Sequence, residues 1–289
     1  GAYLDDLQHP TNNDEKPLEY LVRKNGLMRI LRSLGYTIVD FDSGYHITED
    51  LGADVHLNAS LSISEFHRLL LRNTVLSYLI PNAEGHDPSR LARARILNAL
   101  DTLPDVARRP EPTFTFAHIL CPHPPFLFRA DGQPRSAYTF AFSIGDGDEF
   151  QGSGTEEYIN GYHGQVAFLA ERVQLMIDRL LDESPTPPII IIQSDHGPGS
   201  RMSLHDASKT DVHERLSILN AFFLPSINKN VIPDDISPVN TFRIILNSYF
   251  GTHDAVLPTR NYISGWWDPF QFRDVTEKVQ HPTPMSMSP

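Results

Sequence analysis

Helical and strand-like spacings of hydrophobic residues alternate along the chain. Helical spacing of apolar residues predicts helices over 18–34 and 156–183, and capping residues and prolines predict helices over 62–79, 88–103 and 238–250. Short runs rich in β-branched and aromatic residues predict strands over 36–41, 113–120, 189–192 and 216–224. This alternation is typical of α/β layer folds. We therefore expect an α/β fold in which the four strands share one mainly parallel sheet, with helices on both faces.

The longest predicted helix, 156–183, has the most regular apolar spacing. The residues of its apolar face are Ile159, Tyr162, Val166, Leu169, Val173, Met176 and Leu180. The preceding stretch, 122–154, is rich in proline, glycine and aromatic residues and shows little periodicity. Connections of that length are often functional. No change of composition marks a domain boundary, so we expect a single domain over 1–289 with a loose tail over 280–289.

Composition and charge exclude several classes of protein. Of the 289 residues, 24 are Lys or Arg and 36 are Asp or Glu, which gives a formal net charge of −12 and argues against nucleic-acid binding. The single cysteine, Cys121, permits neither an internal disulfide nor a cysteine-based zinc site. No apolar run reaches the roughly 18 residues of a membrane-spanning helix. The chain starts with Gly1 and not with methionine, so we expect a processed chain or an excised fragment.

The strongest candidate site follows the buried strand 189–192. There Asp195 offers a carboxylate oxygen and His196 an imidazole nitrogen, a pair that suits zinc or manganese. Adjacent strand residues point to opposite faces, so both can reach one ion only if the chain turns, and Gly197 favours such a turn. The alternative is a polar strand end with a solvated Asp and His.

A second candidate site follows the strand 113–120. His123 lies just beyond the strand end, where ligands of parallel sheets gather, and the neighbouring prolines restrict its backbone. We expect His123 to be a ligand or a phosphate contact. His118 lies within the strand, and we interpret it as a hydrogen-bonded core histidine.

Weaker candidates occupy two other segments. The polar segment after the Asp-His pair contains His205, Asp206, Lys209, His213, Glu214 and Arg215. Such groups near a metal can hold an anion or protonate a leaving group, although polar loops are more often just solvated. The segment 40–44, Asp-Phe-Asp-Ser-Gly, also ends a strand, but we interpret it as a strand-to-loop turn.

Taken together, these motifs resemble one known family. Gln-Ser-Asp-His-Gly at 193–197 and His-Pro-Pro-Phe at 123–126 resemble the sulfatase-like branch of the alkaline phosphatase superfamily. Three further stretches agree with it: 214–225, 237–243 and 247–251. The likeness is to bacterial sulfatase-like hydrolases and transferases, related to phosphoethanolamine and phosphoglycerol transferases and lipoteichoic acid synthase, and it covers about 18–276.

The resemblance implies a three-layer α/β/α sandwich, alkaline phosphatase-like, with a divalent metal such as Mn, Zn, Mg or Ca. It implies that Asp195 and His196 bind this metal and that His123 contacts a phosphate or sulfate ester. We group His123, His205 and Arg215 as candidate catalytic residues, and Asp195 and His196 as candidate metal ligands. It also favours an extracytoplasmic domain of a membrane-anchored bacterial protein, with any membrane contact made by a segment outside this chain.

The sequence departs from the family pattern at one decisive place. Family members carry a Ser, Thr or modified Cys nucleophile near the N-terminus, after a strand that ends in an acidic metal ligand. No such segment precedes the first predicted helix, so the chain is expected to be the C-terminal portion of the domain. Two alternatives to an enzyme of this family stay open: a non-catalytic binding or structural module with the same fold, and a cytosolic metal-dependent hydrolase of unrelated family.

Overall fold

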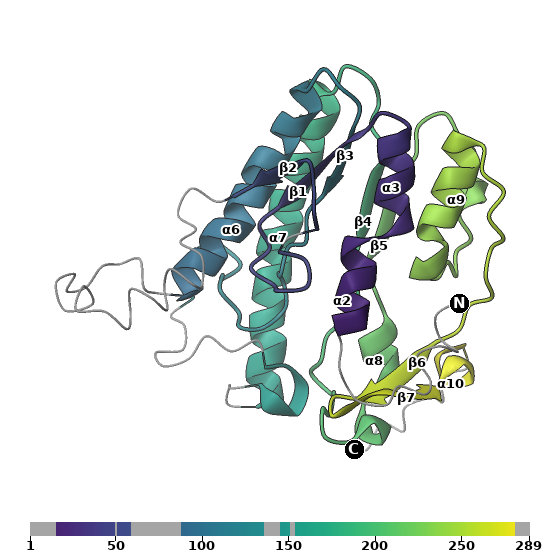
Figure 1. Ribbon diagram of the computed structural model, residues 1–289. Helices are drawn as coiled ribbons and strands as arrows, with labels where there is room; N and C mark the ends of the chain where they lie inside the picture. The colour runs from purple at the N-terminus through teal and green to yellow at the C-terminus, as the bar shows by residue number, and fades with distance from the viewer. Residues whose placement is uncertain (1–15, 50, 59–87, 136–144, 151–153, 281–289) are drawn as a thin grey trace. The chain divides into compact units, whose positions relative to one another are not determined.

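The computed structural model has a mixed α/β fold with a small three-stranded parallel sheet and two antiparallel hairpins (Figure 1). The structure describes residues 16–49, 51–58, 88–135, 145–150 and 154–280. The chain divides into two compact units. Of the described residues, those within 16–135 and 160–185 form what we call the parallel-sheet unit, and those within 145–159 and 186–280 form the hairpin unit.

The parallel-sheet unit is built around β1 (Thr37–Phe41), which pairs in parallel with β2 (Val55–Leu57) on one side and β3 (Thr113–Phe116) on the other. The strand β1 is buried from Ile38 to Phe41. Its position confirms the predicted strand to within one residue. The strand β3 starts as predicted but ends earlier, and β2 is too short for its periodicity to predict.

The helix predicted over 18–34 is interrupted in the structure. It consists of α2 (Lys16–Arg23) and α3 (Gly26–Ser33), which are separated by Lys24 and Asn25. The Asn25 side chain accepts a hydrogen bond from the Met28 N–H at 2.9 Å and donates one to the Val22 carbonyl at 2.8 Å. A side chain that caps one helix and bonds the end of another stops the hydrogen-bond ladder there.

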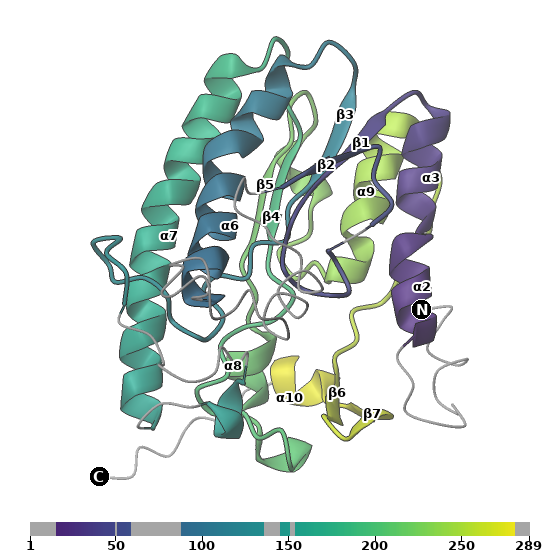
Figure 2. The same cartoon turned by 60° about the vertical axis from the view of Figure 1, so that its left-hand side comes forward.

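The core of this unit lies on both sides of α6 (Pro88–Thr102), a helix that confirms the prediction and continues into the 3₁₀ helix η2 (Leu103–Arg108). Ala99 clusters with Val39 and Phe41 of β1. Another core cluster joins α6 to α7 (Thr155–Glu183), which run side by side in both views (Figures 1 and 2). Its buried residues are Ile96, Leu100, Cys121, Leu127, Phe128, Phe168 and Met176. Burial raises the pKa of the Cys121 thiol to about 12, so this cysteine behaves as a small apolar core residue.

The helix α7 confirms the predicted helix, but its buried face differs in part from the predicted apolar face. Val166 is 38% exposed, whereas its neighbour Gln165 is completely buried. Met176 belongs to both the predicted and the observed face. The difference arises because Gln165 satisfies its polar atoms inside the protein, which a hydrophobic pattern does not register.

The hairpin unit contains two separate antiparallel pairs. The strand β4 (Ile190–Gln193) pairs with β5 (Asn220–Phe223), and β6 (Tyr262–Gly265) pairs with β7 (Asp268–Asp274). Its helices are α8 (Val212–Leu216), α9 (Pro238–Phe250) and α10 (Thr276–Gln280), with 3₁₀ turns η3 (Gly147–Glu149), η4 (Ala207–Lys209) and η5 (Lys229–Val231). As predicted, α9 begins after Ser237 and ends at Gly251, which has a φ of 67°.

The prediction that all four strands share one mainly parallel sheet is wrong. The strands β3 and β4 belong to different sheets, and β4 pairs with β5 in antiparallel. Parallel neighbours need a long crossover, usually a helix. Between β4 and β5 the chain forms only η4 and the five-residue α8. The predicted strand 216–224 also begins late, because Asp211 caps α8 by accepting hydrogen bonds from the His213 and Glu214 N–H groups at 3.0 and 3.2 Å.

Two predictions fall outside the described residues, namely the helix over 62–79 and the loose tail apart from its first residue. Within the described ranges, no helix is both long and apolar enough to cross a membrane. The expectation of a single domain over 1–289 stays a prediction.

Candidate functional site

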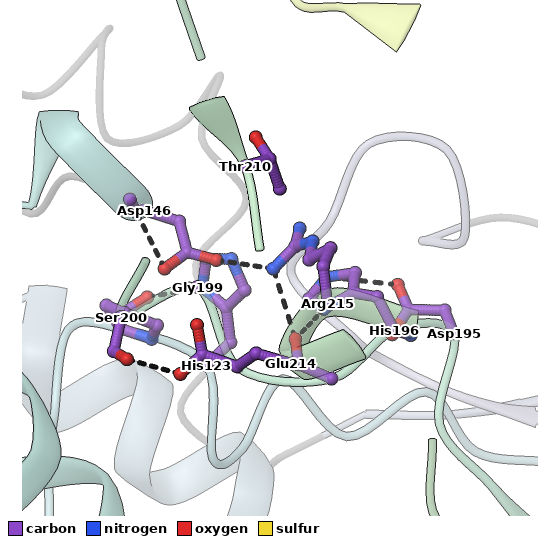
Figure 3. Close-up of polar contacts among 12 residues, drawn as sticks. His123, Asp146, Asp195, His196, Gly199, Ser200, Thr210, Glu214 and Arg215 are labelled. Atoms are coloured by element: carbon purple, nitrogen blue, oxygen red, sulfur yellow. Dashed lines mark hydrogen bonds and ion pairs between the residues drawn. The ribbon is translucent and has the colours of Figure 1, made fainter. Parts of the chain in front are cut away.

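Asp195 and His196 lie on the loop that follows β4 in the hairpin unit (Figure 3). The hydrogen bonding of the hairpin continues one residue beyond β4, because the Ser194 N–H donates to the Leu219 carbonyl at 2.9 Å. The chain then turns. The His196 N–H donates to Asp195 Oδ1 at 3.0 Å, and His196 Nε2 lies 3.6 Å from Asp195 Oδ2.

The His196 ring is oriented by the backbone that follows it. Its Nδ1 lies 2.9 Å from the Gly197 carbonyl oxygen. A carbonyl can only accept, so this contact requires a proton on Nδ1 and leaves the lone pair of the neutral ring on Nε2. The lone pair then faces the Asp195 carboxylate, whose side chain is 74% exposed. Two acceptors this close together favour a shared proton or a shared cation, as in metal-binding histidines whose other nitrogen bonds a backbone carbonyl.

Close packing of the loop explains its glycines. The Gly197 N–H donates to the Arg215 carbonyl at 2.7 Å, and a side chain at this position would collide with the Glu214 and Ser217 carbonyl oxygens. A Cβ atom on Gly199 would lie 2.5 Å from an oxygen of the Asp146 carboxylate. Both residues must therefore be glycine for the loop to approach its neighbours this closely.

A buried polar network, which we call the Asp146 network, lies under the loop and consists of Asp146, Tyr158 and Arg215. Asp146 Oδ1 accepts a hydrogen bond from the Tyr158 hydroxyl, and Asp146 Oδ2 accepts one from Arg215 Nη1, both at 2.8 Å. The Tyr158 hydroxyl accepts a hydrogen bond from the Gly199 N–H at 2.8 Å. Burial, followed by the charge of Asp146, raises the pKa of Tyr158 far above its usual range, so the hydroxyl keeps its proton.

Sequence reasoning missed two members of this network. Asp146 lies between Gly145 and Gly147 in the aperiodic stretch 122–154, where the composition gave a general signal for function but none for this residue. Tyr158 lies near the start of α7, where a tyrosine has the same pattern as any other amphipathic position. Their shared role depends on contacts among segments far apart in sequence.

Arg215, a predicted catalytic residue, is instead found within this network. Its side chain is 18% exposed, and its Nη1 also donates to the Gly197 carbonyl at 3.2 Å. His205, the other candidate from the polar segment, lies on the surface with Nε2 3.7 Å from Glu149 Oε1. The catalytic roles of both residues stay predictions.

The remaining charged residues of the polar segment have local structural contacts. Asp206 accepts a hydrogen bond from the Ser208 N–H at 3.0 Å and so caps η4, while Lys209 Nζ lies 3.7 Å from Asp206 Oδ2. The Glu214 carboxylate accepts hydrogen bonds from the Ser200 hydroxyl and, at 2.8 Å, from the Arg201 N–H. These contacts shape the loop that carries the Asp-His pair.

His123 belongs to the parallel-sheet unit and repeats the arrangement of His196. Its Nδ1 lies 2.6 Å from the Pro124 carbonyl oxygen, which again leaves the lone pair of the neutral ring on Nε2. The loop around it is held by Gln165, whose Oε1 accepts the Leu127 N–H at 2.7 Å and whose Nε2 donates to the Pro122 carbonyl at 3.1 Å. The expectation that His123 converges with Asp195 and His196 stays a prediction.

The carboxyl end of β1 carries polar groups that are paired within the parallel-sheet unit. Asp42 forms a 2.9 Å ion pair with Arg95, and it accepts the Gly44 N–H at 3.1 Å, which confirms the interpretation of 40–44 as a strand-to-loop turn. His118 Nδ1 lies 2.7 Å from Thr48 Oγ1. This contact confirms the predicted hydrogen bonding of His118, although the side chain is only partly buried.

The chemistry of the donors limits any metal site. Among the residues that the structure describes, no three His, Cys, Asp or Glu side chains lie together as a metal-binding group. Catalytic zinc sites use three protein ligands. Asp195 and His196 alone therefore fit weak binding of a divalent ion, and we derive no reaction step through one.

Comparison with known proteins gives no relative for this chain. No family model, no curated protein and no solved structure matches it.

Proposed function

We propose that the protein is a metal-dependent hydrolase or transferase that acts on phosphate or sulfate esters, with the α/β/α architecture of the sulfatase-like family. One observation carries the proposal: the Gly197 carbonyl orients the His196 ring so that Nε2 faces the exposed carboxylate of Asp195. The motifs at 123–126 and 193–197 support the same family.

In this proposal each side chain has a distinct task. Asp195 and His196 would hold a divalent ion, and such an ion would supply Lewis-acid polarisation of an ester oxygen. His123, with Nδ1 held by the Pro124 carbonyl, contacts a phosphate or sulfate oxygen as the imidazolium, in which Nε2 also carries a proton and can donate. The exposed His205 is the candidate for proton transfer to a leaving group, and Arg215 supports the loop from below.

The role of Asp195 is tested by calorimetric titration with Mn²⁺ and Zn²⁺. We expect weak metal binding by the unaltered chain. Asp195→Ala should lower the metal affinity at least about tenfold, because the loss of a residue that only hydrogen-bonds a metal ligand already lowers affinity by that factor. Asp182→Ala is the matched control, because Asp182 is an exposed carboxylate on α7. Unchanged affinity in Asp195→Ala would remove Asp195 from the proposed site.

The role of His123 is tested by binding of inorganic phosphate and sulfate to the Mn²⁺-loaded protein. We expect His123→Ala to weaken anion binding roughly tenfold or more, because a hydrogen bond to a charged group contributes about 1.5–3 kcal/mol. Metal affinity should stay the same. His163→Ala, which changes an exposed histidine of α7, is the control. Equal anion binding by His123→Ala and the control would contradict the assigned role.

A second candidate function is a binding module without catalysis. It is favoured because Asp195 and His196 supply two ligands, and no third His, Cys, Asp or Glu joins them among the described residues. The two functions differ in turnover of aryl phosphates and sulfates. Metal-dependent turnover that Asp195→Ala abolishes would select the enzyme. Anion binding without turnover would select the module.

A further inference from the structure

We infer that Asp146 and Tyr158 are positioning residues, which hold the Gly197 carbonyl and thereby fix the His196 ring with its proton on Nδ1. This inference deepens the proposed function and rests on it in one respect, the role of His196 as a metal ligand. The geometry of the ring itself is independent of any metal.

The first connection runs through Arg215. Asp146 Oδ2 accepts from Arg215 Nη1 at 2.8 Å, and the same Nη1 donates to the Gly197 carbonyl at 3.2 Å. That carbonyl is also the acceptor for His196 Nδ1 at 2.9 Å. The buried carboxylate is therefore linked to the imidazole through Arg215 Nη1 and the Gly197 carbonyl oxygen, and the direction of this oxygen decides which ring nitrogen carries the proton.

The second connection runs through Tyr158. Its hydroxyl donates to Asp146 Oδ1 and accepts the Gly199 N–H, both at 2.8 Å. The backbone is thus held at two points, the Gly197 carbonyl and the Gly199 N–H, on either side of Pro198. Two fixed points prevent the peptide groups between them from rotating.

Burial makes this frame rigid. The Asp146 side chain is 6% exposed, and Tyr158 is 2% exposed. Asp146 Oδ1 also accepts the Gly147 N–H at 2.9 Å, so both carboxylate oxygens are bonded within the hairpin unit. A buried carboxylate with three donors has one favourable orientation, and Figure 3 shows it facing Arg215.

The test is the tautomer of His196, measured by nitrogen-15 NMR without metal at a pH where the ring is neutral. We expect a single Nδ1–H tautomer in the unaltered protein. Tyr158→Phe should give a mixture of tautomers, because the Gly199 N–H loses its acceptor and the loop gains freedom. Tyr249→Phe is the matched control: the Tyr249 hydroxyl donates to the Pro225 carbonyl at 2.7 Å, so this variant also loses a hydrogen bond between a tyrosine hydroxyl and the backbone. It should leave the His196 tautomer unchanged.

A second variant, Arg215→Lys, tests the inference even if Tyr158→Phe does not fold. Arg215→Lys keeps a positive charge for Asp146 but lacks the planar fork that reaches the Gly197 carbonyl, so it too should mix the tautomers. In the metal titration, both variants should lower affinity by about 10–100-fold. A single Nδ1–H tautomer in every folded variant would overturn the inference. If the tautomers change but no metal binds to the unaltered protein, the inference holds and the proposed function fails.

Discussion

Replacing Gln165 by leucine should lower the free energy of unfolding by about 2–5 kcal/mol. Gln165 is completely buried. Its side chain bonds the Leu127 N–H at 2.7 Å and the Pro122 carbonyl at 3.1 Å. Leucine has a similar volume but no polar atom, so the buried Leu127 N–H and the partly buried Pro122 carbonyl would both lose their partner. Chemical denaturation measures the change, and hydrogen exchange of the Leu127 amide reports whether the loop itself has loosened.

The same helix offers a matched control. Gln174 also lies on α7 but is exposed, so Gln174→Leu should change the free energy of unfolding by no more than about 0.5 kcal/mol. If both variants lose the same amount, the loop around His123 does not depend on Gln165. Protection of the Leu127 amide equal to that in the unaltered chain would lead to the same conclusion.

The sequence predicted the elements whose signals are local. The helices α6, α7 and α9 have capping residues, prolines or glycines at their ends and regular apolar spacing, and all three are found where expected. The strand β1 was predictable because its residues are mostly β-branched or apolar and are buried along nearly the whole strand.

Pairing between strands could not be predicted in the same way. An apolar run such as Ile190–Gln193 has the same pattern whether its neighbour runs parallel or antiparallel. The connection decides the direction, and the loop after β4 contains a capped five-residue helix in place of a crossover helix. The cap at Asp211 is a local signal that could have revealed this helix.

The same difference between local signals and long-range contacts applies to the residues of the candidate site. Asp195, His196 and His123 could be selected as candidates because each follows a predicted strand and belongs to a short motif. Asp146 and Gln165 were missed because their importance comes from burial, since a buried polar side chain must find partners. Asp146 finds them in the side chains of Tyr158 and Arg215, and Gln165 in the backbone of the loop around His123. Hydrophobic periodicity assigns such residues to the solvent side.

The ion pair between Arg215 and the buried carboxylate of Asp146 provides the second large effect. Arg215→Ala should lower the free energy of unfolding by about 3–5 kcal/mol, because it leaves the Asp146 carboxylate buried without its cation. The side chains of Arg215 and Asp146 are 18% and 6% exposed, and their atoms lie 2.8 Å apart. The Tyr158 hydroxyl and the Gly147 N–H still donate to the carboxylate, which favours the lower end of that range.

An exposed ion pair in the same unit supplies the comparison. Arg201 and Asp211 lie 3.2 Å apart, but the Arg201 side chain is 52% exposed, so Arg201→Ala should cost no more than about 1 kcal/mol. The double variant Asp146→Asn with Arg215→Met separates the cost of an uncompensated charge from the worth of the pair. It should be more stable than Arg215→Ala, since no charge is then buried. The single variants Asp146→Asn and Arg215→Met complete the comparison. If the double variant loses as much free energy of unfolding as these two together, the buried carboxylate does not depend on Arg215. The destabilisation then comes from lost packing of the arginine side chain.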